Sequence, residues 1–504
     1  MSNTTSYAAC SWTREMASSS IKETAENTFP QFDLSQIKPL MPGYHIWDAW
    51  FVLNEEDNQI ADVYGHRILV ALGSKVGNPE SSARLMYFVS QDGIHYAACG
   101  RLLSEGNLYI DDYACPPSNT ILPNGEEWSG STVFREGRYI QTFYTLASGY
   151  QAHGVWQKRQ QFASLTQSIA FRGLNIKAST ITNNENFDPT LIPRGCPFFL
   201  FQESHHIIAE PETESPYQTA ESASNYESQN PNQHDWENGD DQSNNFCFRD
   251  PKFVKTKGSI SDAYLFFEAN TSNYLTPSGD NKKGLEGEYD KDFIGSTTFA
   301  EHDDITPDAK RANACIGAMK LINPTSSKTL EGNREKYSAQ GSFLLPIFYA
   351  NFVSDEIERI NLIEHNDYYY LFFTTHSNKM AFGGEAMVNR DMMIGFRSAD
   401  PISKVGLSGI VNSLIQWEPL NGNGVVIQQK SPGPRFSGQD QNHQYVYSWM
   451  VLPNLTVLCY SNFSTDKNGN IQPIKTMGPS VQLEIDGTTT RINPEPIYNF
   501  KPMD

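Results

Sequence analysis

Residues 358–373 read ERINLIEHNDYYYLFF, which is an apolar strand that starts on charged residues, a polar turn, and a second strand rich in aromatic side chains. Alternating apolar and polar residues on both sides of such a turn predict a β-hairpin. The same phrase occurs four more times, with its two predicted strands at 47–53 and 67–72, 128–134 and 139–144, 249–254 and 263–268, and 447–452 and 456–460. The sequence therefore predicts five hairpins spread over most of the chain.

Hairpins that recur at intervals of about 80 to 120 residues favour radial repetition of small sheets, as in an all-β, five-bladed β-propeller. In such a ring the first strand of each blade lies beside the central axis, so residues at its start meet at one mouth of the central channel. Any large β protein contains similar hairpins, so the pattern alone leaves other all-β architectures open. We expect one domain over residues 1–504, with an N-terminal extension at about 1–35 and a surface insertion at about 203–245.

Composition and charge narrow the class of protein. Aromatic residues make up 12% of the chain, with 35 Gly and 28 Pro, which favours strands joined by turns over packed helices. The net charge is −20, and the sequence contains no cluster of basic residues. Nucleic acid and anionic membranes are therefore poor partners. The seven scattered cysteines form no CxxC pair, and we interpret them as buried thiols rather than as a disulfide or zinc framework.

The acidic, polar stretch 203–245 contains few large apolar residues, which is typical of a surface insertion or mobile loop, and 275–308 is similar. His205, His206 and His234 lie in the first stretch without metal-ligand spacing, so we expect them to be solvated. The first twenty residues lack both a charged and a continuous apolar region, and no apolar run is long enough to span a bilayer. We therefore expect a soluble protein without a cleaved signal peptide.

Three of the predicted inner strands start on a carboxylate: Asp48 between aromatic residues, Asp250 before a proline, and Glu358 before an arginine. One such acid is most simply a turn cap or ion pair, but three at equivalent positions of three repeats suggest a shared site. Retaining cleavage of a glycoside needs two carboxyl groups about 5 to 5.5 Å apart, one as nucleophile and one as acid. A third carboxylate can bind sugar hydroxyls as the ring gains positive charge.

Four motifs in this order resemble those of glycoside hydrolase family 68: Trp47-Asp48, Trp128-Ser129-Gly130, Arg249-Asp250-Pro251 and Asp355-Glu356-Ile357-Glu358-Arg359. Phe267-Glu268-Ala269-Asn270-Thr271, Tyr447-Ser448 and Trp12-Thr13-Arg14 agree with the resemblance, which covers about residues 10 to 500. The family comprises levansucrases, inulosucrases and related β-fructofuranosidases.

The resemblance implies that Asp48 is the nucleophile, Glu358 the general acid/base and Asp250 the transition-state stabiliser. It further implies a sucrose pocket lined by Trp47, Trp128, Ser129, Arg249, Glu356, Arg359, His376 and Tyr447. Because Glu358 must be protonated before the first step, its pKa is expected to lie above that of Asp48. No cofactor is expected.

The sequence departs from the family pattern in two places. His376 stands where Gram-positive levansucrases usually carry arginine and so resembles the Gram-negative branch, whereas residues 355–359 resemble the Gram-positive form. Asp355 and Asn313 could serve a structural calcium site, but Asn244 stands where an aspartate is expected. The loss of one carboxylate weakens a site for a hard cation, so no bound metal is predicted.

The implied activity is a levansucrase-type transfer of fructosyl units from sucrose to a growing fructan, sucrose or water. A β-fructofuranosidase, an inulosucrase and a non-catalytic carbohydrate-binding propeller remain alternatives. The expected partners are sucrose and sugar acceptors, without nucleic acid or membrane, for a monomer or weak oligomer. The family implies an extracellular location, reached without a recognisable signal, and a cytoplasmic location is the alternative.

Overall fold

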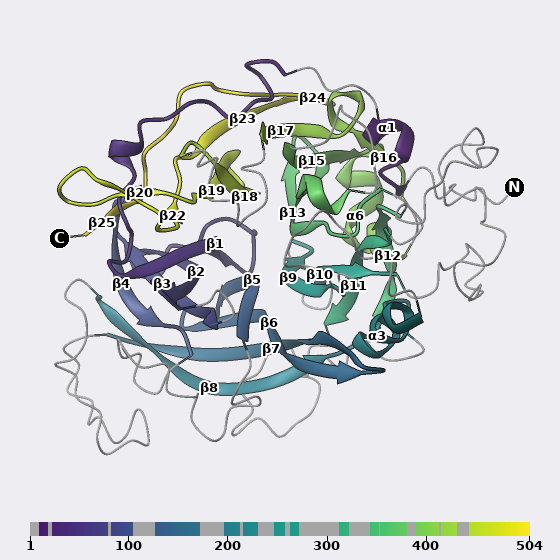
Figure 1. Cartoon of the computed structure of the whole chain (residues 1–504), viewed down its shortest axis with the longest axis horizontal. Coiled ribbons are helices and arrows are strands. Elements are labelled where there is room, and N and C mark those ends of the chain that lie inside the picture. Colours follow the sequence, from purple (N-terminus) through teal and green to yellow (C-terminus); the bar gives the residue numbers. More distant parts are fainter. Residues whose placement is uncertain are drawn as a thin grey trace, which may run out of the picture.

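The computed structural model describes a protein built mostly of β-strands (Figure 1). The description covers residues 10–18, 23–78, 82–103, 126–171, 196–211, 215–229, 246–257, 263–271, 312–321, 343–351, 353–380, 390–412, 415–430 and 443–503. Among these residues, no helix is long and apolar enough to cross a membrane.

All five predicted hairpins are confirmed as antiparallel pairs. They are formed by β1 (Tyr44–Asn54) with β2 (Arg67–Lys75), β5 (Glu126–Arg135) with β6 (Tyr139–Ala152), β9 (Phe248–Lys255) with β10 (Ala263–Asn270), β13 (Glu358–His365) with β14 (Tyr368–Thr375), and β18 (Val446–Val451) with β19 (Thr456–Ser461).

Further strands extend each hairpin into a larger sheet. The added strands are β3 (Arg84–Ser90), β4 (His95–Arg101), β7 (Val155–Phe171), β8 (Phe198–Ala209), β11 (Ala314–Leu321), β12 (Phe343–Tyr349), β15 (Arg390–Ser398), β16 (Trp417–Pro419), β17 (Val425–Lys430), β22 (Thr476–Met477), β23 (Val481–Asp486) and β24 (Thr489–Ile492). The short strands β20 (Ser464–Thr465) and β21 (Ile471–Gln472) pair with each other, and β25 (Lys501–Pro502) pairs with β4.

The described helices are few and short. They are α1 (Arg14–Ser18), α3 (Ala220–Gln229) and α6 (Ile402–Asn412), with 3-10 turns η2 (Leu34–Gln36), η8 (Ser377–Lys379) and η9 (Leu420–Gly422). The expected all-β class is therefore confirmed.

The first strands of the five hairpins lie around the middle of the molecule, with the later strands of each sheet farther out (Figure 1). These inner strands contact one another in the order β1, β5, β9, β13, β18 and back to β1. Between β1 and β5 the contact includes a short parallel pairing of Val52–Asn54 with Thr132–Phe134. This pairing joins two four-stranded groups, β1 to β4 and β5 to β8, which together with β25 form one nine-stranded sheet.

Aromatic side chains from the hairpin strands fill the space between neighbouring sheets. Phe143 of β6 stacks on Phe253 of β9 with ring centroids 5.6 Å apart, and Phe348 of β12 lies 5.5 Å from Phe373 of β14. Such pairs add directional packing to a large buried apolar area. The high aromatic content of the sequence thus serves the seams between sheets.

Each of the five inner strands carries one extra residue relative to its hairpin partner, and in every case at the motif that the sequence repeats. The bulges lie between Trp47 and Trp50, Trp128 and Gly130, Arg249 and Lys252, Glu358 and Asn361, and Tyr447 and Met450. A bulge re-aims a side chain and interrupts pairing, and bulges are frequent beside active sites.

Four bulge residues have a left-handed backbone although none is glycine: Asp48 (φ 49°), Asp250 (φ 58°), Arg359 (φ 58°) and Ser448 (φ 62°). Each such conformation costs on the order of 1–3 kcal/mol and persists only where the surroundings hold it. At the β5 bulge a side chain is excluded, because a Cβ on Gly130 would lie 1.9 Å from the Phe143 carbonyl oxygen. Four of the five strands therefore present their motif residues with the same left-handed backbone, and the β5 bulge makes its close approach through Gly130.

The expected loop at 203–245 is wrong for two of its parts. Residues 203–209 continue β8, which pairs along much of β7, and 220–229 form α3. His205 is half-buried in β8, where its Nε2 lies 2.6 Å from the Tyr144 hydroxyl, so it is not a solvated loop residue. His234 and residues 275–308 lie outside the described residues.

The N-terminal residues pack onto the sheets. Trp12 is fully buried, and its indole donates to the Asn423 carbonyl at 3.2 Å. The backbone N–H of Ile492 donates to the Glu26 carbonyl at 2.8 Å, so the start of the chain lies against the last sheet. Six cysteines are buried free thiols as expected, and Cys115 lies outside the described residues.

Candidate active site

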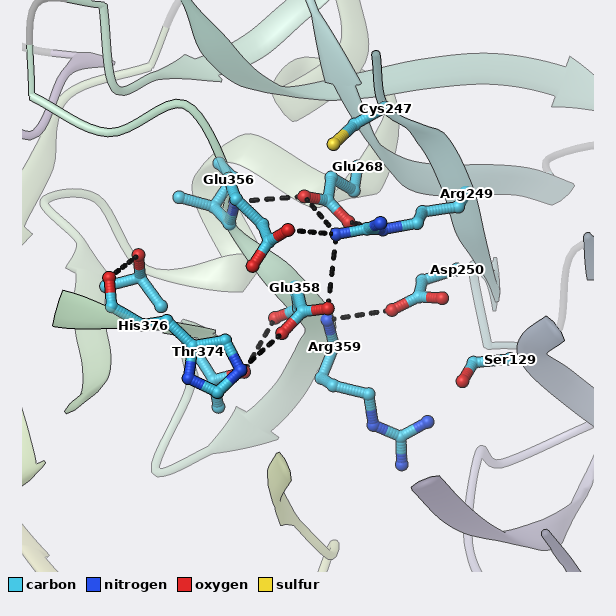
Figure 2. A network of polar contacts seen from close by, with 12 residues as sticks. Ser129, Cys247, Arg249, Asp250, Glu268, Glu356, Glu358, Arg359, Thr374 and His376 are labelled. Atoms are coloured by element: carbon cyan, nitrogen blue, oxygen red, sulfur yellow. Dashed lines mark hydrogen bonds and ion pairs between the residues drawn. The ribbon is translucent and has the colours of Figure 1, made fainter. Parts of the chain in front are cut away.

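Arg249 on β9 is the centre of a cluster of carboxylates (Figure 2). Its Nε donates to Glu268 Oε2 at 2.6 Å, while its Nη2 lies 2.6 Å from Glu356 Oε2 and 3.1 Å from Glu358 Oε1. The guanidinium fork suits several carboxylates at fixed angles. One arginine therefore ties β9 and β10 to the start of β13.

Asp48 joins this cluster from β1. Its Oδ2 accepts a hydrogen bond from the Ser129 hydroxyl of β5 at 3.1 Å, and its backbone carbonyl accepts one from Arg359 Nη1 at 3.3 Å. Because a serine hydroxyl can donate only one proton, its bond to Oδ2 leaves Oδ1 of the carboxylate for other partners. Strands β1, β5 and β13 thus fix the orientation of Asp48.

Asp250 is buried beside Asp48 and Arg359. Its Oδ2 accepts the backbone N–H of Arg359 at 3.1 Å, and its own N–H donates to the Thr145 hydroxyl at 3.1 Å. Burial raises the pKa of Asp250 above its usual value, against the opposing charges of Arg249 and Arg359, and the charge of Asp48 adds to the increase. The two aspartates therefore share one electrostatic environment.

Glu358 is the proposed general acid, and its surroundings change its protonation equilibrium. Burial, assisted by the charges of Glu356 and Asp48, raises its pKa to about 7, although Arg249 and His376 oppose the increase. Its Oε2 accepts a hydrogen bond from the Tyr447 hydroxyl at 2.8 Å. At neutral pH Glu358 is therefore divided between acid and carboxylate, as a group that both gives and takes protons requires.

His376 follows β14 and stacks on Tyr447, with ring centroids 3.8 Å apart. Its Nε2 lies 3.9 Å from Glu358 Oε2, and its Nδ1 lies 3.1 Å from Asp391 Oδ2 on β15. The histidine therefore touches the acid on one side and a second, buried carboxylate on the other.

Trp128 forms one side of the site, with its indole N–H donating to Glu126 Oε2 at 2.8 Å. The Lys158 ammonium lies 4.8 Å and the Arg249 guanidinium 5.8 Å from the centre of its ring. Trp47 is buried, and the Lys475 ammonium lies 5.6 Å from its ring centre. Ten of the eleven proposed site residues are thus linked by contacts, and Trp47 is placed next to Asp48 by the chain alone.

Sequence reasoning missed Glu268 and Asp391 as members of this network. Glu268 is fully buried, binds Arg249 through both of its oxygens, and accepts the Ile357 N–H at 3.0 Å. The sequence placed Glu268 on the strand that returns beside Arg249, but the direct pairing of these two residues depends on the β9 bulge. Asp391 had no such signal, since it begins a strand outside the five hairpins.

A family model described as Levansucrase/Invertase, of the glycoside hydrolase 68 group, matches residues 1–184 and 226–498. The chain belongs to this family. The levansucrase of Bacillus amyloliquefaciens is 27% identical over 481 residues, which are 92% of this chain and 83% of that protein. The extracellular sucrase of Zymomonas mobilis is 24% identical over 494 residues, with 96% and 93% covered.

The fold is shared with a solved member of the levansucrase/invertase family. The crystal structure of Bacillus subtilis levansucrase matches with a TM-score of 0.69 at 21% identity, and 98% of each chain is covered. Likeness at this identity shows the fold alone.

Two of the calcium candidates carried over from the levansucrase/invertase family lie close together in this chain. The Asn270 side-chain amide donates to Asn313 Oδ1 at 2.9 Å and to the Asp355 backbone carbonyl at 3.1 Å. The amide donor at Asn313 Oδ1 competes with a cation that would need this oxygen as a ligand. Asn244 lies outside the described residues, and the expected absence of calcium stays a prediction.

Proposed function

We propose that this chain is a retaining fructosyltransferase of the levansucrase type, which cleaves sucrose through a covalent fructosyl-enzyme intermediate. The observation that carries the proposal is the convergence of three acids from three different strands. The backbone N–H of Arg359, the residue after Glu358, donates to Asp250, the Arg359 guanidinium donates to the Asp48 carbonyl, and the charge of Asp48 raises the pKa of Glu358. Two carboxyl groups with different protonation, plus a third that stabilises positive charge, are what retaining glycoside cleavage requires.

In the first half of the cycle Glu358 gives its proton to the glycosidic oxygen as the bond to fructose breaks. Asp48 attacks the anomeric carbon of the fructosyl unit from the other side, and glucose leaves. The raised pKa of Glu358 keeps a share of this residue protonated near neutral pH. The hydrogen bond from Ser129 holds the attacking carboxylate in place.

In the second half Glu358 acts as a base. It removes a proton from water or from a sugar hydroxyl, which attacks the anomeric carbon and releases Asp48. The carboxylate of Asp250, beside both Asp48 and Arg359, stabilises the positive charge that develops on the fructosyl ring in each half.

The side chains around the acids provide hydrogen bonds and an aromatic face for a neutral sugar. Arg249, Glu356, Arg359, His376 and Tyr447 supply charged or polar groups next to Glu358 or Asp48. Trp128 supplies an aromatic ring beside Arg249, and Trp47 is proposed for the same pocket from its place next to Asp48. Most of these groups engage one another, so substrate binding must exchange some of these contacts.

The ring of sheets fits five blades of a propeller, with the active site at one mouth of the central channel. The nine-stranded sheet divides into β1 to β4 and β5 to β8, because only a short parallel pairing joins the two groups. With the sheets that start on β9, β13 and β18 this makes five units of at least four strands. Each unit contributes its bulge to the site.

Products of sucrose turnover separate this function from its alternatives. A transferase releases glucose in excess over free fructose, a β-fructofuranosidase releases equal amounts, and a carbohydrate-binding protein releases neither. Linkage analysis of the fructan separates a levansucrase from an inulosucrase. The names of the two relatives, a levansucrase and an extracellular sucrase, support a sugar substrate and an extracellular site of action.

The covalent mechanism is tested by Asp48→Ala, compared with Asp466→Ala in an exposed turn. We expect the Asp48 variant to lose several orders of magnitude in sucrose turnover, with an unchanged circular dichroism spectrum, and the Asp466 variant to keep its rate. Rapid quenching of the wild type with sucrose, followed by peptide mass spectrometry, should show a fructosyl unit on Asp48. A near-normal rate for Asp48→Ala, or a label on another residue, would exclude this mechanism.

A further inference from the structure

Asp391 lies behind His376, on the side away from Glu358. It is buried, with 1% of its surface exposed. Its Oδ2 accepts the Tyr445 hydroxyl, its Oδ1 accepts the backbone N–H of Ser377 at 2.9 Å, and His376 Nδ1 lies 3.1 Å from Oδ2. Burial raises the pKa of Asp391, but His376 and these two donors more than offset that effect, so its pKa is below the usual value. The buried group is therefore a carboxylate at neutral pH.

An ionised carboxylate can only accept hydrogen bonds, so the His376 nitrogen that faces it must carry a proton. This fixes the hydrogen on Nδ1 and leaves Nε2 toward Glu358 Oε2, 3.9 Å away. Opposite charges at this separation stabilise each other's charged forms. Stacking on Tyr447, whose hydroxyl also binds Glu358 Oε2, prevents the ring from turning away.

We propose that Asp391 is a positioning residue of the reaction: it holds His376 in one tautomer, favours the imidazolium, and so sets the pH at which Glu358 stops acting as an acid. The inference rests on the proposed role of Glu358. Asp391 itself touches neither Glu358 nor the other acids in any described contact and acts through the histidine.

The charged groups around Glu358 come from every strand that faces it, and they determine the direction of the effect. Glu356 and Asp48 favour the protonated acid, whereas Arg249 and His376 favour the carboxylate, and the neutral Tyr447 hydroxyl donates to it. A substitution that makes the His376 imidazolium less stable therefore removes one of the two cations that lower the pKa of Glu358. Glu358 then stays protonated to higher pH.

The test is the pH dependence of kcat/KM for sucrose in the full-length wild type, Asp391→Asn and His376→Gln. We expect the alkaline limb to move upward by about 1 pH unit in both variants, on the scale of one neighbouring charge. In the double variant the limb should lie where His376→Gln alone places it, because Asp391 acts only through His376. A purely structural loss would lower the rate at every pH and leave the limb in place.

Glu418→Gln is the matched control, since it removes a carboxylate paired with Arg397 in the same sheet and should leave the limb unchanged. If Asp391→Asn does not fold, His376→Gln alone tests the inference, because its limb should rise by the same amount. An unshifted limb in Asp391→Asn or His376→Gln, or additive shifts in the double variant, overturns the inference. Absence of sucrose turnover by the wild type would instead refute the proposed function.

Discussion

Replacing the buried acid by its neutral isostere, Glu358→Gln, should abolish turnover and change how stability depends on pH. Folding raises the pKa of Glu358 from 4.5 to about 7, so the folded state favours the protonated form. The unfolded chain releases the proton above about pH 4.5, so the wild type loses stability as the pH rises from there through 7. At 1.36 kcal/mol for each pKa unit, the full loss is about 3 kcal/mol.

The measurement is the free energy of unfolding by denaturant for both proteins between pH 4.5 and 8, taken as the difference between them. The part of this difference that does not change with pH reflects the altered hydrogen bonds to Arg249 and Tyr447. Between pH 4.5 and 8 the free energy of unfolding of the variant should rise by about 3 kcal/mol relative to that of the wild type. Most of this rise should be complete by pH 7. Glu484→Gln, at an exposed pair with Arg491, serves as the control with a flat difference. A flat difference for Glu358→Gln would refute the altered protonation on which the catalytic assignment depends.

Two further substitutions test the centre and the support of the site. Arg249→Lys keeps the positive charge but replaces a fork that binds three carboxylates by a single ammonium. We expect kcat to fall by about 10²-fold, and an unchanged rate would contradict the central role of Arg249. Gly130→Ala places a Cβ 1.9 Å from the Phe143 carbonyl oxygen, and the forced shift should cost about 1–3 kcal/mol, measured as a lower midpoint in chemical denaturation; an unchanged midpoint would show that the β5 bulge tolerates a side chain.

The five hairpins were predictable because strand alternation and turn composition are local properties of the chain. Tyr368 to Phe373, for example, form β14 as the aromatic run predicts. The three acids were predictable because each begins a repeated phrase. Their left-handed or bulged geometry was not, since no local preference of aspartate or arginine demands a bulge and the surrounding sheets impose it.

The rest of the network depends on register and on pairs distant in sequence. The sequence placed His376 in the predicted sucrose pocket. Its Nδ1 contact with Asp391 could not be predicted, because it depends on β15 lying beside β14. The long strand β8 was missed because residues 203–206 are all polar, which is typical of a loop, whereas their place in the sheet is set by pairing with β7. Composition alone therefore did not predict this strand.

The order in which the site is synthesised has a consequence for how the protein matures. Asp48 is made about 400 residues before Tyr447, which binds the acid Glu358 and belongs to the last of the five hairpins. Strands can form sheet by sheet as the polypeptide grows, but the reacting groups meet only when β18 docks between β13 and β1. During refolding, sucrose turnover should therefore lag behind the recovery of β-structure, and its appearance marks the moment at which the circle of sheets shuts.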